Sequence, residues 1–291
     1  MAVRSASTRR LRELGSRVAE LEIARTAPRA VLLTGSAAIG ESDYQSDLDL
    51  ILYHDELPSD ATLAACRDEL GGTDFVELGR AEGEYGEQVK VDGIDCQLGH
   101  STVAAWERDM AAVLDQLEVD TPIQKALGGL LEGIVLHDPD GLLAGWRARA
   151  SAYPERLRIA MVEANLAIPA TWYIADRLRP RDAKLWLHEE LVDAAYQVLG
   201  VLAGLNRVYF SRFQFKRLRR FADSLAVAPP DIADRLDLFF TGDDDLAVAT
   251  LEELVPELRE LVRVHLPAAL IPSLRRPPGS RHQPWGGRAG G

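Results

Sequence analysis

The sequence predicts an α+β fold, in which a small mixed β-sheet with flanking helices is followed by an all-helical C-terminal part. Up to about residue 100, short apolar runs bounded by turn residues are typical of strands. Beyond that point the apolar residues recur at helical spacing. The 291 residues are enough for roughly two domains. We expect an N-terminal helix at 1–25, a sheet domain at 26–110, a helical domain at 111–270 and a disordered tail, rich in glycine, proline and arginine, at 271–291.

The first elements are a long helix and a buried strand. Apolar residues at helical spacing, among them Leu11, Leu14 and Val18, predict a helix over about 7–26. The apolar run RAVLLTG, which ends at Gly35, is typical of a buried strand. The small residues that follow it, AAIG, indicate a short helix.

Further strands and one helix follow before residue 100. The stretch DLDLILY predicts a second strand, and SDATLAACRDELGG predicts a helix capped by Ser59 or Asp60. DFVELG indicates a short strand. EQVKVDGIDCQLG predicts a hairpin, because Asp92-Gly93 is a strong two-residue turn signal between apolar residues.

The remainder of the chain is predicted to be helical. Residues 101–135 have apolar spacing of helical period, and the turn LHDPDG ends them. Three long helical stretches then follow: YPERLRIAMVEANLAIPATWYIADRL, KLWLHEELVDAAYQVLGVLAGLNRVYF and ATLEELVPELRELVRVHL.

Charge and cysteine content narrow the classes of function. A formal net charge of −12 opposes general binding to nucleic acids or anionic membranes. Cys66 and Cys96 make neither a zinc motif nor a disulfide framework, which fits a reducing compartment. There is no apolar run of about 18 residues and no apolar core after the basic N-terminus. We therefore expect a cytoplasmic protein.

Two aspartates at the start of the second strand are the first candidates for chemistry. Side chains alternate along a strand, so Asp47 and Asp49 face the same side, roughly 6.6 Å apart along the chain. Like charges placed this way repel each other unless a cation lies between them. The pair suits Mg²⁺, which binds through one or two carboxylates together with phosphate oxygens.

The pair Gly35-Ser36 supplies features that favour phosphate. Glycine lets the backbone approach a ligand closely, and the free N–H groups at a helix start favour anions. The hydroxyl group of Ser36 adds another donor. The sequence thus predicts phosphate at Gly35-Ser36 and its metal ions at Asp47 and Asp49.

A third carboxylate is expected to complete a two-metal site. Asp95 is the best candidate, because it lies in the strand after the hairpin turn and shares a face with Gln97. Asp92 is the nearest rival, but an aspartate in a turn has an ordinary structural role. Asp43, in the preceding loop, is interpreted in the same structural way.

The order Gly35-Ser36, ten residues, Asp47-Leu48-Asp49-Leu50 and a later strand acid resembles the signature of the DNA polymerase beta-like nucleotidyltransferase superfamily. The resemblance covers about residues 30–100. The layout is similar to that of aminoglycoside nucleotidyltransferases, which carry a helical C-terminal domain.

The resemblance implies an enzyme that transfers a nucleoside monophosphate, AMP from ATP, to a hydroxyl group of a small molecule and releases pyrophosphate. It implies that Asp47 and Asp49 bind two Mg²⁺ ions, and that Asp95 completes one shell and helps to deprotonate the acceptor. Catalysis would then rest on positioning and on charge neutralisation.

Several alternatives stay open. The basic run 212–220 is either a solvated helix face or a source of a cation, such as Lys216, for the triphosphate. Transfer to RNA or protein is a second activity, which the net charge disfavours for RNA. A non-catalytic nucleotide-binding regulator is a third reading. The acceptor, the base and the oligomeric state are not fixed by the sequence.

Overall fold

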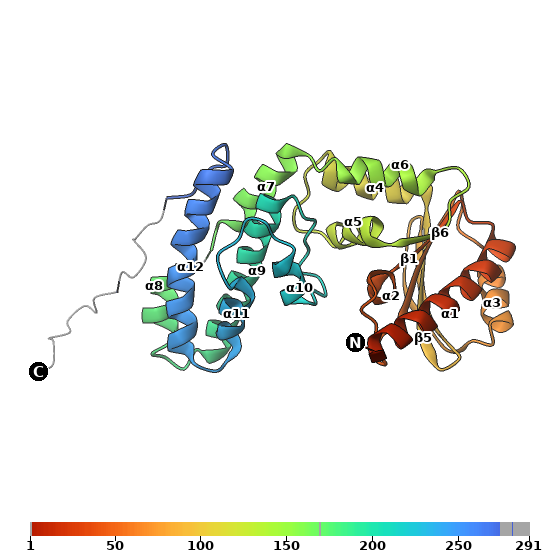
Figure 1. Ribbon diagram of the computed structural model, residues 1–291, viewed down its shortest axis with the longest axis horizontal. Coiled ribbons are helices and arrows are strands. Elements are labelled where there is room, and N and C mark those ends of the chain that lie inside the picture. The colour runs from red at the N-terminus through yellow and green to blue at the C-terminus, as the bar shows by residue number, and fades with distance from the viewer. Residues whose placement is uncertain (1, 169, 274–280, 282–291) are drawn as a thin grey trace, which may run out of the picture. The chain divides into compact units, whose positions relative to one another are not determined.

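The computed structural model describes residues 2–168, 170–273 and 281 (Figure 1). The chain forms two compact units, one made of Met1–Gln116 and Lys125–Tyr153, the other of Leu117–Gln124 and Pro154–Gly291. Most of the predicted disordered tail, at 274–280 and 282–291, lies outside the described residues.

The first unit is built on a six-stranded sheet in the order β3-β4-β5-β2-β1-β6. Its strands are β1 (Ala30–Thr34), β2 (Leu48–His54), β3 (Thr73–Ala81), β4 (Glu84–Val91), β5 (Ile94–Thr102) and β6 (Ile134–His137). Within the described chain, β2 and β5 run parallel and the other neighbouring pairs run antiparallel. The α+β class predicted from the sequence is therefore confirmed.

Local sequence signals explain most of these elements. The hairpin between β4 and β5 turns at Asp92 and Gly93, which both have positive φ, as the turn signal predicts. Helix α3 (Asp60–Glu69) begins after Ser59, whose side chain accepts a hydrogen bond from the backbone N–H of Thr62. The predicted cap is thus Ser59 rather than Asp60.

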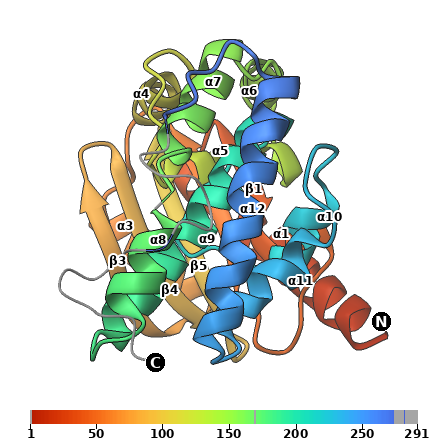
Figure 2. The ribbon, with the colours of Figure 1, turned by 90° about the vertical axis from the view of Figure 1, so that its left-hand side faces the viewer.

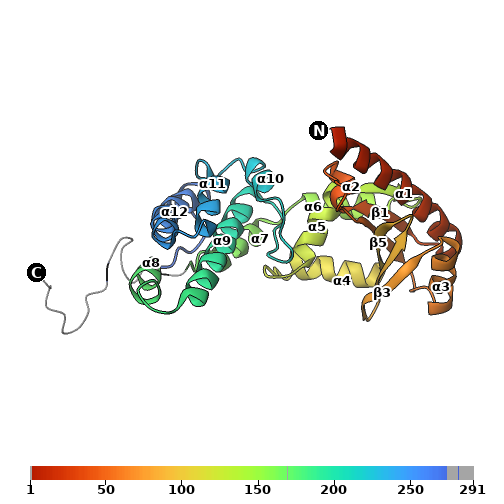
Figure 3. The same cartoon turned by 90° about the horizontal axis from the view of Figure 1, so that it is seen from below.

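One face of the sheet, called the rear face below, packs against α1 (Ala2–Thr26) and α3 (Figure 3). Alternate residues of the central strands point to this side and are fully buried. The cluster that they form with α1 contains Leu14, Val18, Leu33, Leu48, Leu50, Leu52, Val89, Cys96 and Leu98. Because the apolar residues of β2 point to the rear, its intervening residues, Asp49 among them, face the other way.

The opposite face, called the front face below, carries a cluster of aromatic side chains near the end of β2. Tyr53, near the end of β2, is buried against Trp106 of α4 (Val103–Leu114) and Trp146 of α6 (Leu142–Ser151). The ring centroids of Tyr53 and Trp146 lie 4.8 Å apart. Asp49, the second residue of β2, is half-buried.

The strand β6 differs from the helical prediction for residues 101–135. The strand follows α5 (Ile123–Glu132), and its residues Ile134, Val135 and His137 pair with β1. This pairing returns residues 125–153 to the first unit, although the sequence placed the domain boundary near residue 110. The apolar run Ile134 to Leu136 is too short to show a periodicity of its own, and pairing with the edge of β1 makes it a strand.

The second unit is helical. Its helices are α7 (Glu155–Asn165), α8 (Thr171–Tyr173), a π-helical turn (Ile174–Leu178), α9 (Lys184–Asn206), α10 (Leu218–Asp223), α11 (Ile232–Asp237), a 3₁₀ turn (Leu238–Phe240) and α12 (Asp244–His265). Helix α9 packs beside α7 and α12 (Figure 2). The first predicted long helix is in fact interrupted, because α7 ends at Asn165. None of the described helices combines the length and the apolar character that a membrane span requires.

Candidate functional site

The candidate site begins where β2 and β5 run side by side on the front face. The parallel register places Asp49 opposite Gln97, one step beyond the pair Leu48 and Cys96. Asp47 lies in the loop directly before β2, and its Oδ2 accepts a 2.9 Å hydrogen bond from Nε2 of Gln97. Asp47, Asp49 and Gln97 are all half-buried. Two carboxylates and one amide are therefore held next to each other at the start of β2.

Gly35 forms a cradle for the carboxylate of Asp49. It follows β1 and opens the short helix α2 (Gly35–Ile39) with a φ of +66°. A Cβ atom at this position would lie 2.0 Å from Oδ2 of Asp49, far inside any permitted contact. Residue 35 must therefore be glycine for two reasons: the left-handed backbone and the space that Asp49 occupies.

The hydroxyl group of Ser36 is used inside the protein. Ser36 is buried, and its Oγ lies 3.1 Å from Oγ of Ser42 in the loop that leads to β2. The backbone N–H of Ser42 in turn donates to Oγ1 of Thr8 on α1. The contacts fix the loop that carries Asp47. In the same loop Asp43 accepts hydrogen bonds from Gln45 and Ser46, so its predicted role as a turn residue is confirmed.

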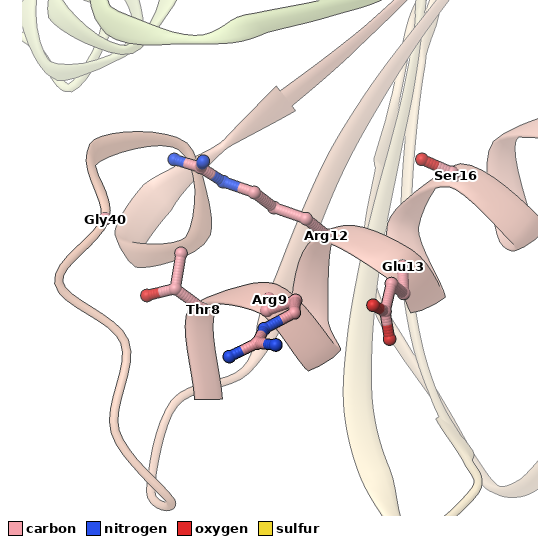
Figure 4. Close-up of a pocket in the computed structure, with 6 residues that line it drawn as sticks. All are labelled: Thr8, Arg9, Arg12, Glu13, Ser16 and Gly40. Atoms are coloured by element: carbon pink, nitrogen blue, oxygen red, sulfur yellow. The ribbon is translucent and has the colours of Figure 1, made fainter. Parts of the chain in front are cut away.

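Arg12 of α1 holds α2 from outside the sheet. Its Nε and Nη2 donate to the carbonyl oxygens of Ala37 and Ala38 at 2.8 and 2.9 Å. An open depression of about 500 Å³ lies beside it, lined by Thr8, Arg9, Arg12, Glu13, Ser16 and Gly40 (Figure 4). None of these residues is a predicted site residue, so we assign the depression no part in the chemistry.

Asp95 shares the front face but points its carboxylate to a different neighbour. Lys90 of β4 lies opposite it in register, and its Nζ is 3.8 Å from Oδ1 of Asp95 and 2.9 Å from Oδ2 of Asp74. The side chain of Asp95 is 48% exposed, so the ion pair is a weak one. The residue of β5 that donates a hydrogen bond to Asp47 is Gln97, two residues beyond the predicted third ligand.

The described residues contain no group of three or more histidine, cysteine, aspartate or glutamate side chains arranged to hold a metal. The structure brings Asp49 to Gly35 and Gln97 to Asp47. Asp95 directly precedes Cys96, the register partner of Leu48, just as Asp47 directly precedes Leu48. The sequence missed Gln97 as a partner, although alternation already put it on the face of Asp95.

Asp47 and Asp49 nevertheless fit Mg²⁺. They are oxygen donors on one face, and the Gly35 cradle is shaped around one of them. Mg²⁺ in nucleotide sites takes one or two carboxylates, with phosphate and water oxygens completing the octahedron, rather than a cage made of protein alone. The exposed ion pair between Asp95 and Lys90 contributes little free energy, so Asp95 remains available as a further ligand.

The predicted cation Lys216 lies in the second unit. It is exposed, in the irregular segment before α10. The neighbouring Arg212 and Arg219 bind acidic residues of their own unit, namely Asp193, Asp234 and Asp237. Arg212 and Arg219 thus belong to local ion pairs at the surface, and the role of Lys216 stays a prediction.

A second polar cluster lies on the rear face. Glu87 of β4 is fully buried and accepts hydrogen bonds from Arg67 at 2.5 Å and from Tyr85 at 3.0 Å. Glu22 of α1 is fully buried as well, and burial, followed by the charge of Glu87, raises its pKa to about 7. Burial also raises the pKa of the Cys66 thiol to about 12, so this cysteine is inert.

His100 belongs to this rear face too. Its Nδ1 lies 3.1 Å from Nε2 of His54, and both rings are 1% exposed. Burial lowers the pKa of His54 to about 4, and burial together with His54 lowers that of His100 to about 3. Both imidazoles are therefore neutral at physiological pH.

Comparisons with known proteins give distant structural likenesses. No protein-family model and no curated protein matches the chain. A nucleotidyltransferase-like protein from Exiguobacterium sibiricum aligns with a TM-score of 0.43 and 10% identity over 86% of this chain and 78% of that one. Cid1 in complex with its short product ApU aligns with a TM-score of 0.26 and 15% identity over 66% and 49%.

A cytoplasmic RNA terminal U-transferase gives a TM-score of 0.28 and 13% identity over 86% of this chain and 65% of its own. The chain thus spans less than two thirds of Cid1 and of this transferase. With TM-scores below 0.5, these likenesses decide neither the fold nor the activity, and the functional argument rests on the site.

Proposed function

We propose that the protein is a nucleotidyltransferase that moves a nucleoside monophosphate, AMP from ATP, to a hydroxyl group of a small molecule. The observation that carries the proposal is the pair Asp47 and Asp49 on the front face, with Asp49 seated against the backbone of Gly35. That arrangement combines two oxygen ligands for a hard cation with a close approach to the main chain, as a bound metal–triphosphate requires.

The transfer forms one bond and breaks another. The acceptor oxygen bonds to the α-phosphorus, the bond from that phosphorus to the bridging oxygen breaks, and pyrophosphate leaves with this oxygen. Asp95 takes the hydroxyl proton. Two magnesium ions held by Asp47, Asp49 and Asp95 would neutralise the charge on the phosphates. The backbone N–H groups of Gly35 and Ser36 hold the triphosphate.

Pyrophosphate release from ATP and Mg²⁺, measured across a panel of hydroxyl-bearing acceptors, tests the proposal. We expect acceptor-dependent release by the wild type and its loss in the double variant Asp47→Ala/Asp49→Ala. Equal, background release by both proteins across the panel would sink the idea. Gln88→Ala is a suitable control, because Gln88 lies on the front face in β4 and is not one of the proposed ligands.

The acceptor class can be determined in the same assay by labelling the α-phosphate. Label on a small product supports the proposal, whereas label on RNA or protein in a cell extract would replace the small molecule by a macromolecule. Replacing ATP by GTP, CTP or UTP tests the choice of base. ATP binding that is indifferent to Mg²⁺, measured by calorimetry without any transfer, would instead indicate a nucleotide-binding regulator.

A further inference from the structure

The conformation of Asp47 depends on a residue outside its own loop. Asp47 precedes the first ladder residue of β2, so its side chain is not fixed by the sheet in the way that Asp49 is. An aspartate in such a loop loses rotamer freedom when it binds a cation, and this loss weakens binding. The 2.9 Å hydrogen bond from Gln97 removes that freedom before any ligand arrives.

Gln97 itself is rigidly placed. It lies within β5, paired on one side with Asp49 of β2 and on the other with Gln88 of β4. Its chain neighbours, Cys96 and Leu98, are at most 1% exposed in the rear core. A side chain anchored in the middle of a sheet transmits that rigidity to the carboxylate it contacts.

An amide is chemically suited to this task. A carboxylate only accepts hydrogen bonds, so Nε2 is the atom of Gln97 that faces Asp47. One neutral donor leaves the other lone pairs of the carboxylate for a cation. A lysine or arginine in the same place would bring a positive charge that competes with the metal.

We propose that Gln97 is a positioning residue that holds Asp47 in its metal-binding conformation. The inference rests on the proposed function, because it concerns the same metal site. In this proposal a neutral amide contacts Asp47, whereas the sequence pattern alone predicts Asp95 as the next residue of the site. Hydrogen-bonded partners of metal-binding carboxylates typically contribute about 10- to 100-fold in metal affinity or activity.

The test compares Gln97→Met with Gln88→Met in the full chain. Gln88 is the register partner of Gln97, is half-buried and has the same side-chain length. The probe is Mn²⁺ alone, with the free ion measured by electron paramagnetic resonance. We expect Gln97→Met to weaken Mn²⁺ binding by about 10- to 100-fold, with Gln88→Met close to the wild type. In turnover, the KM for Mg²⁺ should rise more than kcat falls.

Urea unfolding without metal separates positioning from a loss of structure. The two methionine variants should unfold at similar urea concentrations. Wild-type Mn²⁺ affinity in Gln97→Met would overturn the inference, and so would an equal loss in Gln88→Met.

Asp49→Asn separates failure of this inference from failure of the proposed function. If Asp49→Asn loses Mn²⁺ while Gln97→Met keeps it, the metal site stands and only the role of Gln97 fails. A wild-type protein that binds no Mn²⁺ overturns both.

Discussion

The two faces of the sheet in the first unit place carboxylates in different surroundings. On the front face, Asp47 and Asp49 are half-buried. Asp47 accepts a hydrogen bond from the amide of Gln97, and Asp49 lies against the backbone of Gly35. On the rear face, Glu22 and Glu87 have no exposed surface. Burial raises the pKa of both glutamates, and Arg67 counters it at Glu87. The rear carboxylates are enclosed in the core of the unit, whereas the front carboxylates remain partly accessible to solvent.

The largest effect that we expect comes from the rear face. Arg67→Met removes the cation from the fully buried Glu87, and an uncompensated buried charge typically costs about 3–5 kcal/mol of unfolding free energy. Urea unfolding measures the loss. Arg80→Met is the matched control, because Arg80 pairs with Asp60 and Glu77 at the surface and is 45% exposed. Equal losses in the two variants would contradict the distinction between the faces.

The next effect depends on pH. The pKa of Glu22 rises from 4.5 to about 7 on folding, so its contribution to stability is complete below pH 4.5 and is lost as the pH rises toward 7. The loss amounts to about 3 kcal/mol, at roughly 1.4 kcal/mol for each pKa unit. Glu22→Gln does not titrate, so it should gain stability relative to the wild type over this range.

Unfolding free energies of the wild type and Glu22→Gln, measured from pH 4.5 to 7.5, check this expectation. Glu20→Gln, an exposed position on the same helix, should show a difference that does not change with pH. A pH-independent difference for Glu22→Gln would place the charged form of Glu22 in contact with water.

A smaller effect tests the contact between Gly35 and Asp49 on the front face. Gly35→Ala should lower the unfolding free energy by about 1–2 kcal/mol, the usual cost of a left-handed backbone for alanine. It should also abolish Mn²⁺ binding, because its Cβ displaces the carboxylate of Asp49. Gly40→Ala has similar strain at φ +78°, but its Cβ would meet only Nη2 of Arg12, at 4.0 Å. It should therefore lose stability and keep Mn²⁺ binding.

The smallest effect concerns Asp95. Lys90→Met breaks an exposed ion pair, and we expect little destabilisation. If Asp95 is a ligand, losing its competing cation should raise Mn²⁺ affinity by less than about tenfold. Unchanged affinity in both Lys90→Met and Asp95→Asn would exclude Asp95 from the metal site.

The sequence predicted the elements up to residue 102 well because each has a local signal. Alternation marks β2, a cap marks α3, and a two-residue turn marks the hairpin of β4 and β5. No local signal marks β6, which is a strand because it pairs with the edge of β1.

The site was predictable in part for a similar reason. Spacing along β2 put Asp47 and Asp49 on one face, which the structure retains. The pairing register between β2 and β5 joins distant segments, and no local pattern encodes it, so the sequence could not select Gln97 over Asp95 as the partner of Asp47. The buried pair Glu87 and Arg67 was missed because a charged residue in a strand ordinarily predicts an exposed position.

The parallel pairing of β2 with β5 has a consequence for folding. Asp47 and Gln97 are 50 residues apart in the chain, and α3, β3 and β4 all lie between them. Closing so long a loop costs entropy that local contacts do not repay. Contacts of this separation form slowly, so the metal site should be among the last features of the first unit to mature. Metal binding would then report complete folding of this unit. A chain that has formed only its helices and its hairpin has not yet brought Asp47 and Gln97 together.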